Sequence, residues 1–293
     1  MRERLNFSLY AITGENYHPG RGMLEVMEAA IVGGADIVQL RAKDAPKEEV
    51  LAKARALREL TLRHGVPFIV NDYPEIAHAA GADGVHIGQE DLSVAEARAL
   101  LGPNAIVGVS THSIEQARAA ERSGADYIGV GPVYPTGTKP GRQAVTLSYV
   151  REVAVEIRIP WVAIGGIDLQ NVDGVLAAGA PSICAVSAIV GSTDPETAAR
   201  AFRAKIAAAR SQAAMGLTAA AKEQAASSYT LKVNGQEVRL TARHVADLVA
   251  FYGLADKRIV AELNGEIVAR SAWDRTPLSQ GAVVELVHFV GGG

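Results

Sequence analysis

Two hydrophobic patterns alternate along the first two thirds of the chain. Short runs rich in β-branched residues recur, and segments with apolar residues at helical spacing separate them. Strands that alternate with helices predict βαβ units and a parallel sheet. About eight such units can be counted, which favours a closed (β/α)8 barrel, or TIM barrel, over an open doubly wound sheet, the alternative that the pattern also allows. The expected strands are LYAIT, DIVQL, PFIVND, GVHIG, AIVGVS, YIGVG, PWVAIGG and SICAVS.

The pattern changes after about residue 206. Residues 207–228 are rich in Ala and Ser and lack an apolar stripe that could be buried, so we predict a linker that is partly helical at most. Residues 229–293 contain two Asn-Gly turns between strand patterns, one amphipathic helix and a final strand. Asn-Gly between strands is a strong hairpin signal. We therefore predict a small α+β domain after a barrel that spans residues 1–206.

The overall charge and the cysteine content exclude several classes of function. The formal net charge of -3 argues against a general binder of nucleic acid or of anionic membranes. The single cysteine, Cys184, rules out an intramolecular disulfide and a cysteine-rich zinc site, and its apolar surroundings in the sequence predict a place in the core. The N-terminal segment has no apolar run long enough for a signal peptide or a membrane span. We expect a soluble, cytoplasmic protein.

Polar residues cluster where the expected strands end. In a barrel of this class the active site lies at the carboxyl ends of the strands, in the loops that follow them. Because these ends meet at one mouth, we expect their side chains to converge. The residues are Gln39, Arg41, Lys43, Asp44, Asn71, Asp72, His86, Gln89, Asp91, Ser110, Thr111, His112, Thr136, Gly137, Thr138, Lys139, Gly165, Gly166, Ile167, Val186 and Ser187.

Three cations and two carboxylates in this set suit a metal-bound diphosphate. Arg41, Lys43 and Lys139 can bind phosphate oxygens, with Arg acting in bidentate fashion and Lys as a point charge. Asp72 and Asp91 can hold Mg²⁺, which commonly takes one or two carboxylates together with substrate phosphates. Cations and Mg²⁺ on a diphosphate suggest a leaving group, because charge builds on it as its bond breaks.

A second phosphate site is expected after strands seven and eight. Barrels often bind phosphate with backbone N–H groups in this region, where the chain has Gly165-Gly166 and Val186-Ser187. Two phosphate sites in one mouth imply two phosphorylated substrates, or one substrate with a phosphate at each end.

Each residue also has a purely structural interpretation. Asp72 can cap the following helix, Arg41 can pair with Asp44, and Lys139 can be solvated. His86 alternates with its strand neighbours and fits a wall residue better than a catalyst. The recurrence of polar groups at one end of successive strands favours the functional interpretation.

The barrel resembles thiamine-phosphate synthase in an ordered series of motifs. These are QLRAKD, FIVNDY, DGVHIGQEDL, VGVSTHS, GPVYPTGTKPG, AIGGI and AVSAI, and the resemblance covers about residues 9–206. It implies a transferase that joins hydroxymethylpyrimidine diphosphate to thiazole phosphate, with Mg²⁺ as cofactor. The products would be thiamine phosphate and pyrophosphate. A thiazole tautomerase and an inactive barrel that serves as a scaffold are the alternatives, and the complete ionic set argues against both.

The resemblance also implies roles for individual residues. Arg41, Lys43 and Lys139 would be catalytic, because they would stabilise the departing pyrophosphate. Asp72 and Asp91 would bind Mg²⁺. The pyrimidine diphosphate would bind to Gln39, Leu40, Arg41, Ala42, Lys43, Asn71, Ser110 and Lys139. The thiazole phosphate would bind to Thr136, Gly137, Thr138, Gly166, Val186 and Ser187.

One position departs from the family's pattern. The family usually has QLREK where this chain has Ala42. Ala42 alternates with Arg41 and Lys43, so we expect its side chain to point away from the mouth. The lost carboxylate could have oriented one of the two flanking cations, and this detail stays open.

The C-terminal domain resembles the thiamine sulfur-carrier protein, a ubiquitin-like β-grasp domain. The resemblance covers residues 229–293 and rests on VNG, the helix, LNGEIV and the terminal HFVGGG. It implies that an adenylating enzyme activates the Gly293 carboxylate, which becomes a thiocarboxylate and donates sulfur to a thiazole synthase. An extended glycine tail can enter a narrow channel because it has no side chains. The alternatives are a molybdopterin-type sulfur carrier and an inert, flexible end.

Overall fold

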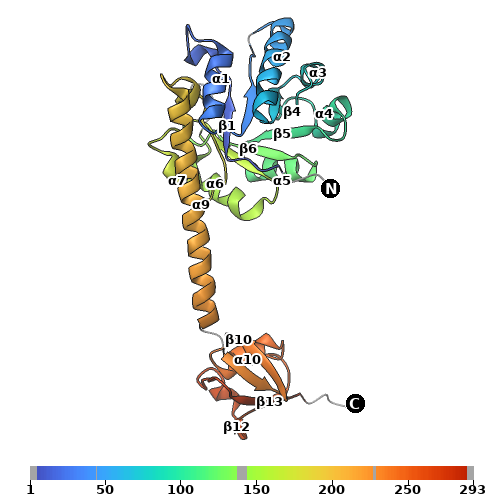
Figure 1. Ribbon diagram of the computed structural model, residues 1–293. Coiled ribbons are helices and arrows are strands. Elements are labelled where there is room, and N and C mark those ends of the chain that lie inside the picture. Colours follow the sequence, from blue (N-terminus) through green and yellow to red (C-terminus); the bar gives the residue numbers. More distant parts are fainter. Residues whose placement is uncertain (1–4, 44, 137–143, 227–228, 289–293) are drawn as a thin grey trace. The chain divides into compact units, whose positions relative to one another are not determined.

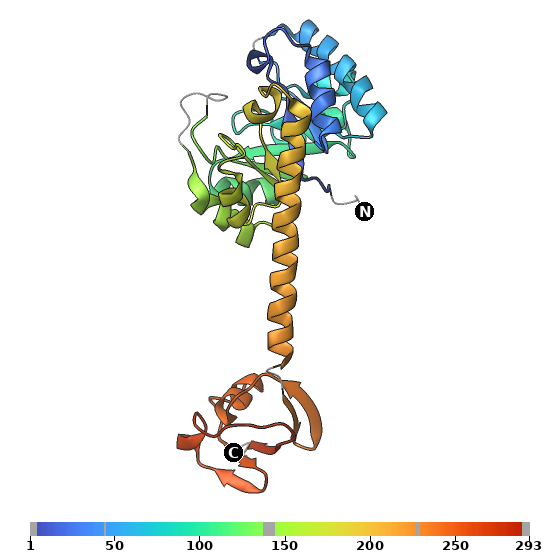
Figure 2. The same ribbon diagram turned by 60° about the vertical axis from the view of Figure 1, so that its left-hand side comes forward.

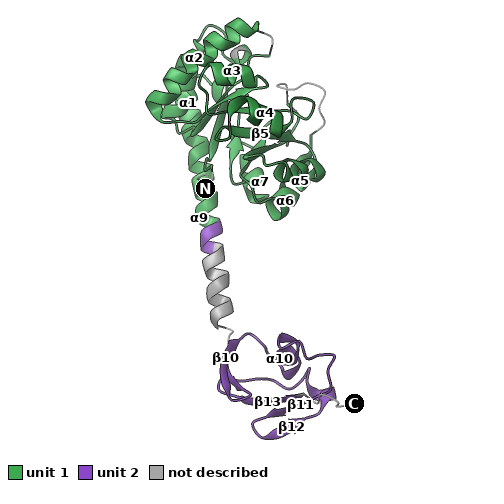
Figure 3. Ribbon diagram, turned by 90° about the vertical axis from the view of Figure 1, so that its right-hand side faces the viewer, with its two compact units in different colours: residues 1–212 green, residues 213–293 purple. Residues whose placement is uncertain are grey.

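The computed structural model describes residues 5–43, 45–136, 144–226 and 229–288. The chain divides into two compact units, residues 1–212 and 213–293 (Figure 3). Each unit has its own hydrophobic core. No helix in the described ranges is long and apolar enough to cross a membrane.

Unit 1 is built on a closed barrel of eight parallel strands, which are neighbours in chain order from β1 to β8. Helices surround the strands on the outside (Figures 1 and 2). The structure confirms the (β/α)8 barrel, and the open-sheet alternative is wrong. The strands are β1 (Leu9–Ile12), β2 (Ile37–Leu40), β3 (Phe68–Asn71), β4 (Gly84–Ile87), β5 (Ile106–Thr111), β6 (Tyr127–Val130), β7 (Trp161–Ile164) and β8 (Ile183–Cys184).

The helices occupy the segments between the strands, as the alternating pattern predicts. Gly65 ends α2 with a φ of 64°, a left-handed conformation that costs glycine little. The helices of unit 1 are η1 (Glu15–Tyr17), α1 (Met23–Val32), α2 (Lys47–His64), α3 (Pro74–Ala79), α4 (Val94–Leu101), α5 (Ile114–Arg122), α6 (Thr146–Glu156), α7 (Val172–Ala177), α8 (Ser187–Val190) and α9 (Pro195–Ala226), whose last residues extend into unit 2.

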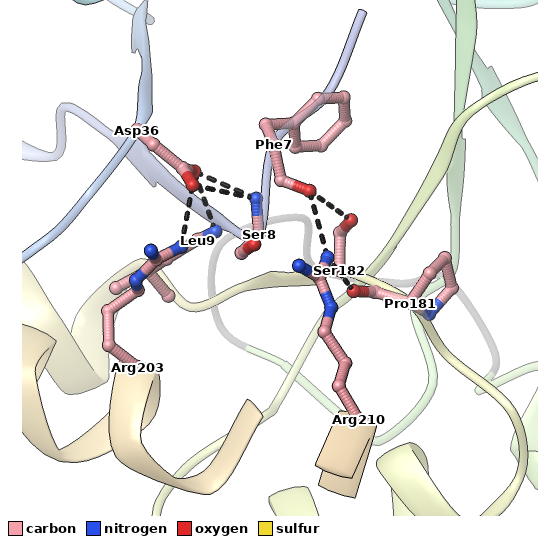
Figure 4. Close-up of polar contacts among 8 residues, drawn as sticks. All are labelled: Phe7, Ser8, Leu9, Asp36, Pro181, Ser182, Arg203 and Arg210. Atoms are coloured by element: carbon pink, nitrogen blue, oxygen red, sulfur yellow. Dashed lines mark hydrogen bonds and ion pairs between the residues drawn. The ribbon is translucent and has the colours of Figure 1, made fainter. Parts of the chain in front are cut away.

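The barrel closes where β1 pairs with β8, a strand of only two residues. So short a pairing supplies few hydrogen bonds of its own, and side chains reinforce it. The Asp36 carboxylate accepts hydrogen bonds from the backbone N–H groups of Ser8 and Leu9 at 2.9 and 2.8 Å (Figure 4). Arg203 of α9 pairs with the same carboxylate at 2.6 Å. The start of β1 is therefore attached to α9 through Asp36.

A second arginine of α9, seven residues after Arg203, binds the same junction of β1 with β8. Arg210 donates to the carbonyl oxygens of Phe7 and Pro181 at 3.3 and 2.8 Å, and Ser182 donates to the Phe7 carbonyl at 2.8 Å (Figure 4). Phe202 of α9 is fully buried in the core of unit 1. The first part of α9 is thus an integral part of the barrel.

Helix α9 differs from the linker that the sequence predicts. It continues to Ala226, so residues 207–226 are helical, whereas we expected a segment that is partly helical at most. Alanine has the highest helix propensity, and the first turns of α9 are already fixed against the barrel, so each further residue avoids the cost of nucleation. The domain limits at residues 206 and 228 stay a prediction.

The described part of unit 2 has a mixed sheet of five strands together with helix α10, which agrees with the predicted β-grasp domain. The strand order is β10-β9-β13-β11-β12, and β13 runs parallel to β9 between two antiparallel hairpins. Asn234-Gly235 and Asn264-Gly265 form the two hairpin turns with positive φ at both residues, as Asn-Gly predicts. The elements are β9 (Tyr229–Val233), β10 (Gln236–Leu240), α10 (Val245–Phe251), β11 (Ile259–Leu263), β12 (Glu266–Val268), η2 (Arg270–Ala272) and β13 (Val283–His288).

Candidate active site

A pocket opens at the carboxyl ends of the barrel strands. All eight strands or the loops that follow them contribute to its wall. This is the end of the barrel at which function is expected. The lining residues that the sequence had not assigned to a substrate are Tyr10, Ile12, His86, His112, Gly129, Gly131, Pro132, Val162, Ile164, Gly165, Ile167 and Cys184.

The structure brings most of the predicted substrate-binding residues into this one pocket. They come from strands on opposite sides of the barrel, as the strand-end rule predicts. Leu40 and Ala42 have no side chain in the wall: Leu40 is buried in the core, and Ala42 packs against the core. The predicted residues that do line the pocket are Gln39, Arg41, Asn71, Ser110, Thr136, Gly166, Val186 and Ser187.

Arg41 is held at the mouth by its backbone. Its N–H donates to the Thr13 hydroxyl at 2.8 Å, and that hydroxyl donates in turn to the Arg41 carbonyl at 3.2 Å. The buried Arg41 Nε has no hydrogen-bond partner among the described residues. A buried guanidinium donor without an acceptor is costly, so the described part of the pocket leaves this donor available for a ligand. An anionic ligand in the pocket would supply an acceptor.

Lys43, Asp72 and Asp91 form an ionic group beside the pocket, although none of them is part of the pocket wall. The Lys43 ammonium lies 2.7 Å from the Asp72 carboxylate. Burial raises the pKa of the Asp72 carboxyl, the Lys43 ammonium lowers it, and the adjacent Asp91 carboxylate raises it, with a net shift upwards. Asp91 also accepts a hydrogen bond from the Gly88 N–H at 2.6 Å. The predicted carboxylate pair is therefore close together in space.

Two carboxylates in contact are a suitable donor set for a hard divalent cation. Asp72 has a φ of 64°, a strained conformation for a residue other than glycine, which is typical of functional sites. The described residues contain no group of three or more His, Cys, Asp and Glu side chains that could enclose a metal. Mg²⁺ usually keeps several waters and needs only one or two carboxylates when a phosphate supplies further oxygens. The residues present fit that mode of binding.

The turn after β7 approaches other backbone so closely that only glycine fits. Gly165 and Gly166 have φ values of 100° and 64°. A Cβ on Gly166 would lie 2.5 Å from the Pro135 carbonyl oxygen. Asn171 donates to the Gly166 carbonyl at 2.8 Å and fixes the turn from the other side. The turn is therefore rigid, with its backbone exposed to the pocket.

Five predicted residues lie outside the described ranges. They are Asp44 after β2, Gly137, Thr138 and Lys139 in the loop after β6, and Gly293. Their predicted roles therefore stay predictions.

Sequence reasoning missed one polar residue of the pocket floor and gave a second one no chemical role. Tyr10 lies in an expected strand but was not proposed as part of the site, and His86 was interpreted as a wall residue. His86 is buried, and its ring nitrogens are bonded to Tyr127 and Ser110 at 3.0 and 2.9 Å. Cys184 is buried as predicted, at 1% exposure, and it also faces the pocket. Inward alternation along each strand was the signal that could have identified these residues.

The fold and the site define a (β/α)8-barrel protein with a pocket at the carboxyl ends of its strands, into which Arg41 contributes a cationic side chain. The family model described as thiamine monophosphate synthase matches residues 9–189, and the chain belongs to this family. The model of the ThiS family matches residues 231–293.

Three known proteins illustrate the similarity of the barrel part of the chain. A thiamine-phosphate synthase of Shouchella clausii is 54% identical over 68% of this chain and 95% of its own length. One from Thermus thermophilus is 50% identical over 62% of this chain and 88% of its own. The solved structure of a thiamine phosphate pyrophosphorylase from Pyrococcus furiosus has a TM-score of 0.64 and 36% identity, and the match covers 69% of this chain and 96% of that one.

Proposed function

We propose that the barrel joins hydroxymethylpyrimidine diphosphate to thiazole phosphate and releases thiamine phosphate and pyrophosphate. Two features of the same barrel mouth carry the proposal: the Arg41 Nε, which has no partner among the described residues, and the ionic group of Lys43, Asp72 and Asp91. Membership in the thiamine-phosphate synthase family supports the same reaction. A diphosphate needs both cationic donors and a metal, and this side of the pocket can offer both.

The reaction exchanges one bond for another. The bond between the pyrimidine methylene carbon and the diphosphate oxygen breaks, and its electron pair leaves with pyrophosphate. The thiazole nitrogen then forms a bond to the same carbon with its lone pair. No proton has to be removed from the nucleophile, so the pocket needs no strong general base. The contribution of the protein is to position the two substrates and to stabilise the charge of the leaving group.

Individual residues would divide this work between the two sides of the pocket. Arg41 and Lys43 would donate to the diphosphate, and Lys139 is proposed to join them. Asp72 and Asp91 would hold Mg²⁺, which when bound supplies a positive charge next to the diphosphate oxygens. The thiazole phosphate would bind on the opposite side of the mouth, at Thr136, Gly137, Thr138, Gly166, Val186 and Ser187.

The metal assignment is tested by substitution and by chelation. Asp72→Asn and Asp91→Asn should each lower the rate of thiamine phosphate formation on the order of 100-fold, because charge stabilisation of the leaving group is lost. The control is Asp173→Asn on α7, since Asp173 pairs with Lys205 on the exposed surface. Excess chelator should abolish turnover of the wild type, and added Mg²⁺ should restore it. Full activity in the chelator would exclude the proposed metal site.

For the C-terminal unit we propose a sulfur-carrier role. The Gly293 carboxylate would be adenylated by a partner enzyme, converted to a thiocarboxylate, and used by a thiazole synthase as the sulfur source. The match of residues 231–293 to the ThiS family supports this proposal. The small size of the unit and the three consecutive glycines at residues 291–293 are consistent with it.

A further inference from the structure

A continuous chain of hydrogen bonds crosses the floor of the pocket. Gln39 Nε2 donates to the Tyr10 hydroxyl at 2.9 Å, and the Tyr10 and Tyr127 hydroxyls lie 2.8 Å apart. The Tyr127 hydroxyl is 3.0 Å from His86 Nδ1, and His86 Nε2 is 2.9 Å from Ser110 Oγ. The two ends, Gln39 and Ser110, line the pocket, whereas Tyr127 does not. We call these five residues the floor relay.

The barrel makes room for the relay at a specific position. A Cβ on Gly108 would lie 2.1 Å from Cζ of Tyr127, so only glycine allows the Tyr127 ring to lie across β5. Phe7 contacts the Tyr10 and Tyr127 rings edge to face, with centroid distances of 5.8 and 5.7 Å. Tyr10 and Tyr127 are 1% and 0% exposed. The middle of the relay is thus dry and rigidly packed, and its hydrogen bonds do not compete with water.

The relay has a direction because each hydroxyl has a single proton. The Gln39 amide nitrogen can only donate, so the Tyr10 proton is directed to Tyr127 and the Tyr127 proton to His86 Nδ1. His86 then has its own proton on Nε2 and donates it to Ser110 Oγ. Burial raises the pKa of both tyrosines, so both phenols keep their protons. If the Gln39 amide were rotated, the donor and the acceptor would exchange in every hydrogen bond of the relay. Gln39 and Ser110 therefore cannot change between donor and acceptor independently of each other.

The direction decides what the two ends present to a ligand. With Nε2 directed at Tyr10, Gln39 keeps Oε1 as an acceptor, to which no described residue donates. Ser110 Oγ accepts from His86 and therefore has its own O–H proton available as a donor. A ligand that matches this pair has an amino group as donor and a ring nitrogen as acceptor. An aminopyrimidine has both groups. A ring with a carbonyl in place of the amino group would place its carbonyl oxygen, an acceptor, against Gln39 Oε1, which is also an acceptor.

We propose that Tyr10, Tyr127 and His86 are positioning residues, which lock Gln39 as acceptor and Ser110 as donor and thereby select an aminopyrimidine over its oxo analogue. The ligand class in this inference rests on the proposed function. The proton arrangement does not, since it rests on the described hydrogen-bond distances and on the orientation of the Gln39 amide, with Nε2 towards Tyr10. Two measurements therefore separate a failure of the relay from a failure of the proposed function.

The first measurement compares the dissociation constants of two pyrimidinylmethyl monophosphates by calorimetry. One has the amino group, the other has a ring carbonyl at that position, and neither has a pyrophosphate to lose. Tyr127→Phe removes the central hydroxyl, which frees the Tyr10 proton and lets the Gln39 amide rotate. The preference of the wild type for the amino compound should then fall on the order of tenfold. Equal weakening of both compounds would overturn the proposal.

The matched control is Tyr149→Phe. Tyr149 is also a buried tyrosine of unit 1, and its hydroxyl donates to Thr111 Oγ1 at 2.7 Å, but it does not line the pocket or belong to the relay. Its removal should leave the preference between the two compounds unchanged. A loss of preference in the control as large as that in Tyr127→Phe would show that packing, and not the relay, sets selectivity.

The second measurement determines the tautomer of His86 by nitrogen NMR on histidine-labelled protein, with His86→Asn to identify its signals. The relay requires the proton on Nε2 and a bare Nδ1, and Tyr127→Phe should produce a mixture of both tautomers. A proton on Nδ1, or on both nitrogens, in the wild type would contradict the direction of the relay. This result does not depend on whether the protein makes thiamine phosphate.

Discussion

Arg41 combines a fixed backbone with an incompletely satisfied side chain. Thr13 holds its main chain, while the buried Nε lacks an acceptor among the described residues. A guanidinium has a planar set of donors that matches phosphate oxygens, and lysine lacks this geometry. The residue is therefore suited to bind two oxygens of a leaving diphosphate at the same time.

Arg41→Lys keeps the positive charge but loses the planar pair of N–H donors that a guanidinium offers to two phosphate oxygens. We expect kcat for thiamine phosphate formation to fall on the order of 100-fold, in the range found when one charge-stabilising donor is removed. The KM for thiazole phosphate should change little. Arg118→Lys is the control, since Arg118 pairs with Glu156 on the outside of the barrel. Steady-state kinetics in both substrates checks the prediction, and an unchanged kcat would remove Arg41 from the leaving-group site.

The sequence predicts the ends of the strands better than the floor of the pocket. Gln39 and Arg41 were identified because polar residues stand out where an apolar strand ends. Tyr10 was not identified, and His86 was given no chemical role, because strands buried on both faces give nearly continuous apolar runs in which the inward alternation is weak. Tyr10 and Tyr127 are also 117 positions apart in the chain, so no local pattern relates them. Their contact follows only from closure of the barrel.

At the scale of elements, α9 has a role that its composition conceals. Its hydrophobic pattern is weak after residue 206, and the sequence therefore predicts the start of a linker there rather than further contacts with the barrel. The structure shows that its arginines bind Asp36 and the backbone of Phe7 and Pro181, at the junction of β1 with β8 (Figure 4). Polar contacts of this kind leave no periodic apolar signal, which is why pattern analysis did not detect the attachment of the helix to the barrel.

Arg210→Ala should destabilise unit 1 at this junction. The Pro181 carbonyl loses its donor, whereas the Phe7 carbonyl keeps the hydrogen bond from Ser182. We expect the free energy of unfolding of the barrel to fall by about 1 kcal/mol, the usual net value of one hydrogen bond. Urea denaturation of the full chain in a Trp273→Phe background, in which Trp161 is the remaining tryptophan, measures the change by fluorescence.

The control for this prediction is Arg200→Ala. Arg200 pairs with Glu196 within α9, and both side chains are largely exposed, at 66% and 41%. Exposed pairs of this spacing contribute only about 0.3–0.5 kcal/mol. If Arg210→Ala were no more destabilising than Arg200→Ala, the contacts of α9 with the β1–β8 junction would not stabilise the barrel.

At the scale of the whole molecule, two compact units with separate cores are encoded in one chain. The sequence predicts both, because each has its own strong pattern: alternating strands and helices in the first, and two Asn-Gly hairpins in the second. The chemistry proposed for them is also separate. The barrel would act at its strand ends, and the second unit at its terminal carboxylate.

Deletion of Gly292 and Gly293 should separate the two proposed activities. The barrel site is built only from unit 1 residues, so synthase activity should stay at the wild-type level. The shortened chain should no longer accept sulfur from the matching adenylating enzyme, ATP and a sulfur donor. Intact-protein mass spectrometry should show a gain of about 16 Da for the wild type, as sulfur replaces one oxygen to give a thiolate-like group, and none for the deletion. A wild type without this gain would argue that the tail is inert.

The central claim is that the barrel is a thiamine-phosphate synthase, and product analysis tests it most directly. The purified full chain is incubated with hydroxymethylpyrimidine diphosphate, thiazole phosphate and Mg²⁺, and thiamine phosphate and pyrophosphate are quantified together. Our account predicts that both products form in equal amounts and only when both substrates are present. Isomerised thiazole phosphate without thiamine phosphate would instead support a tautomerase. The absence of any product from correctly folded protein would support an inactive scaffold.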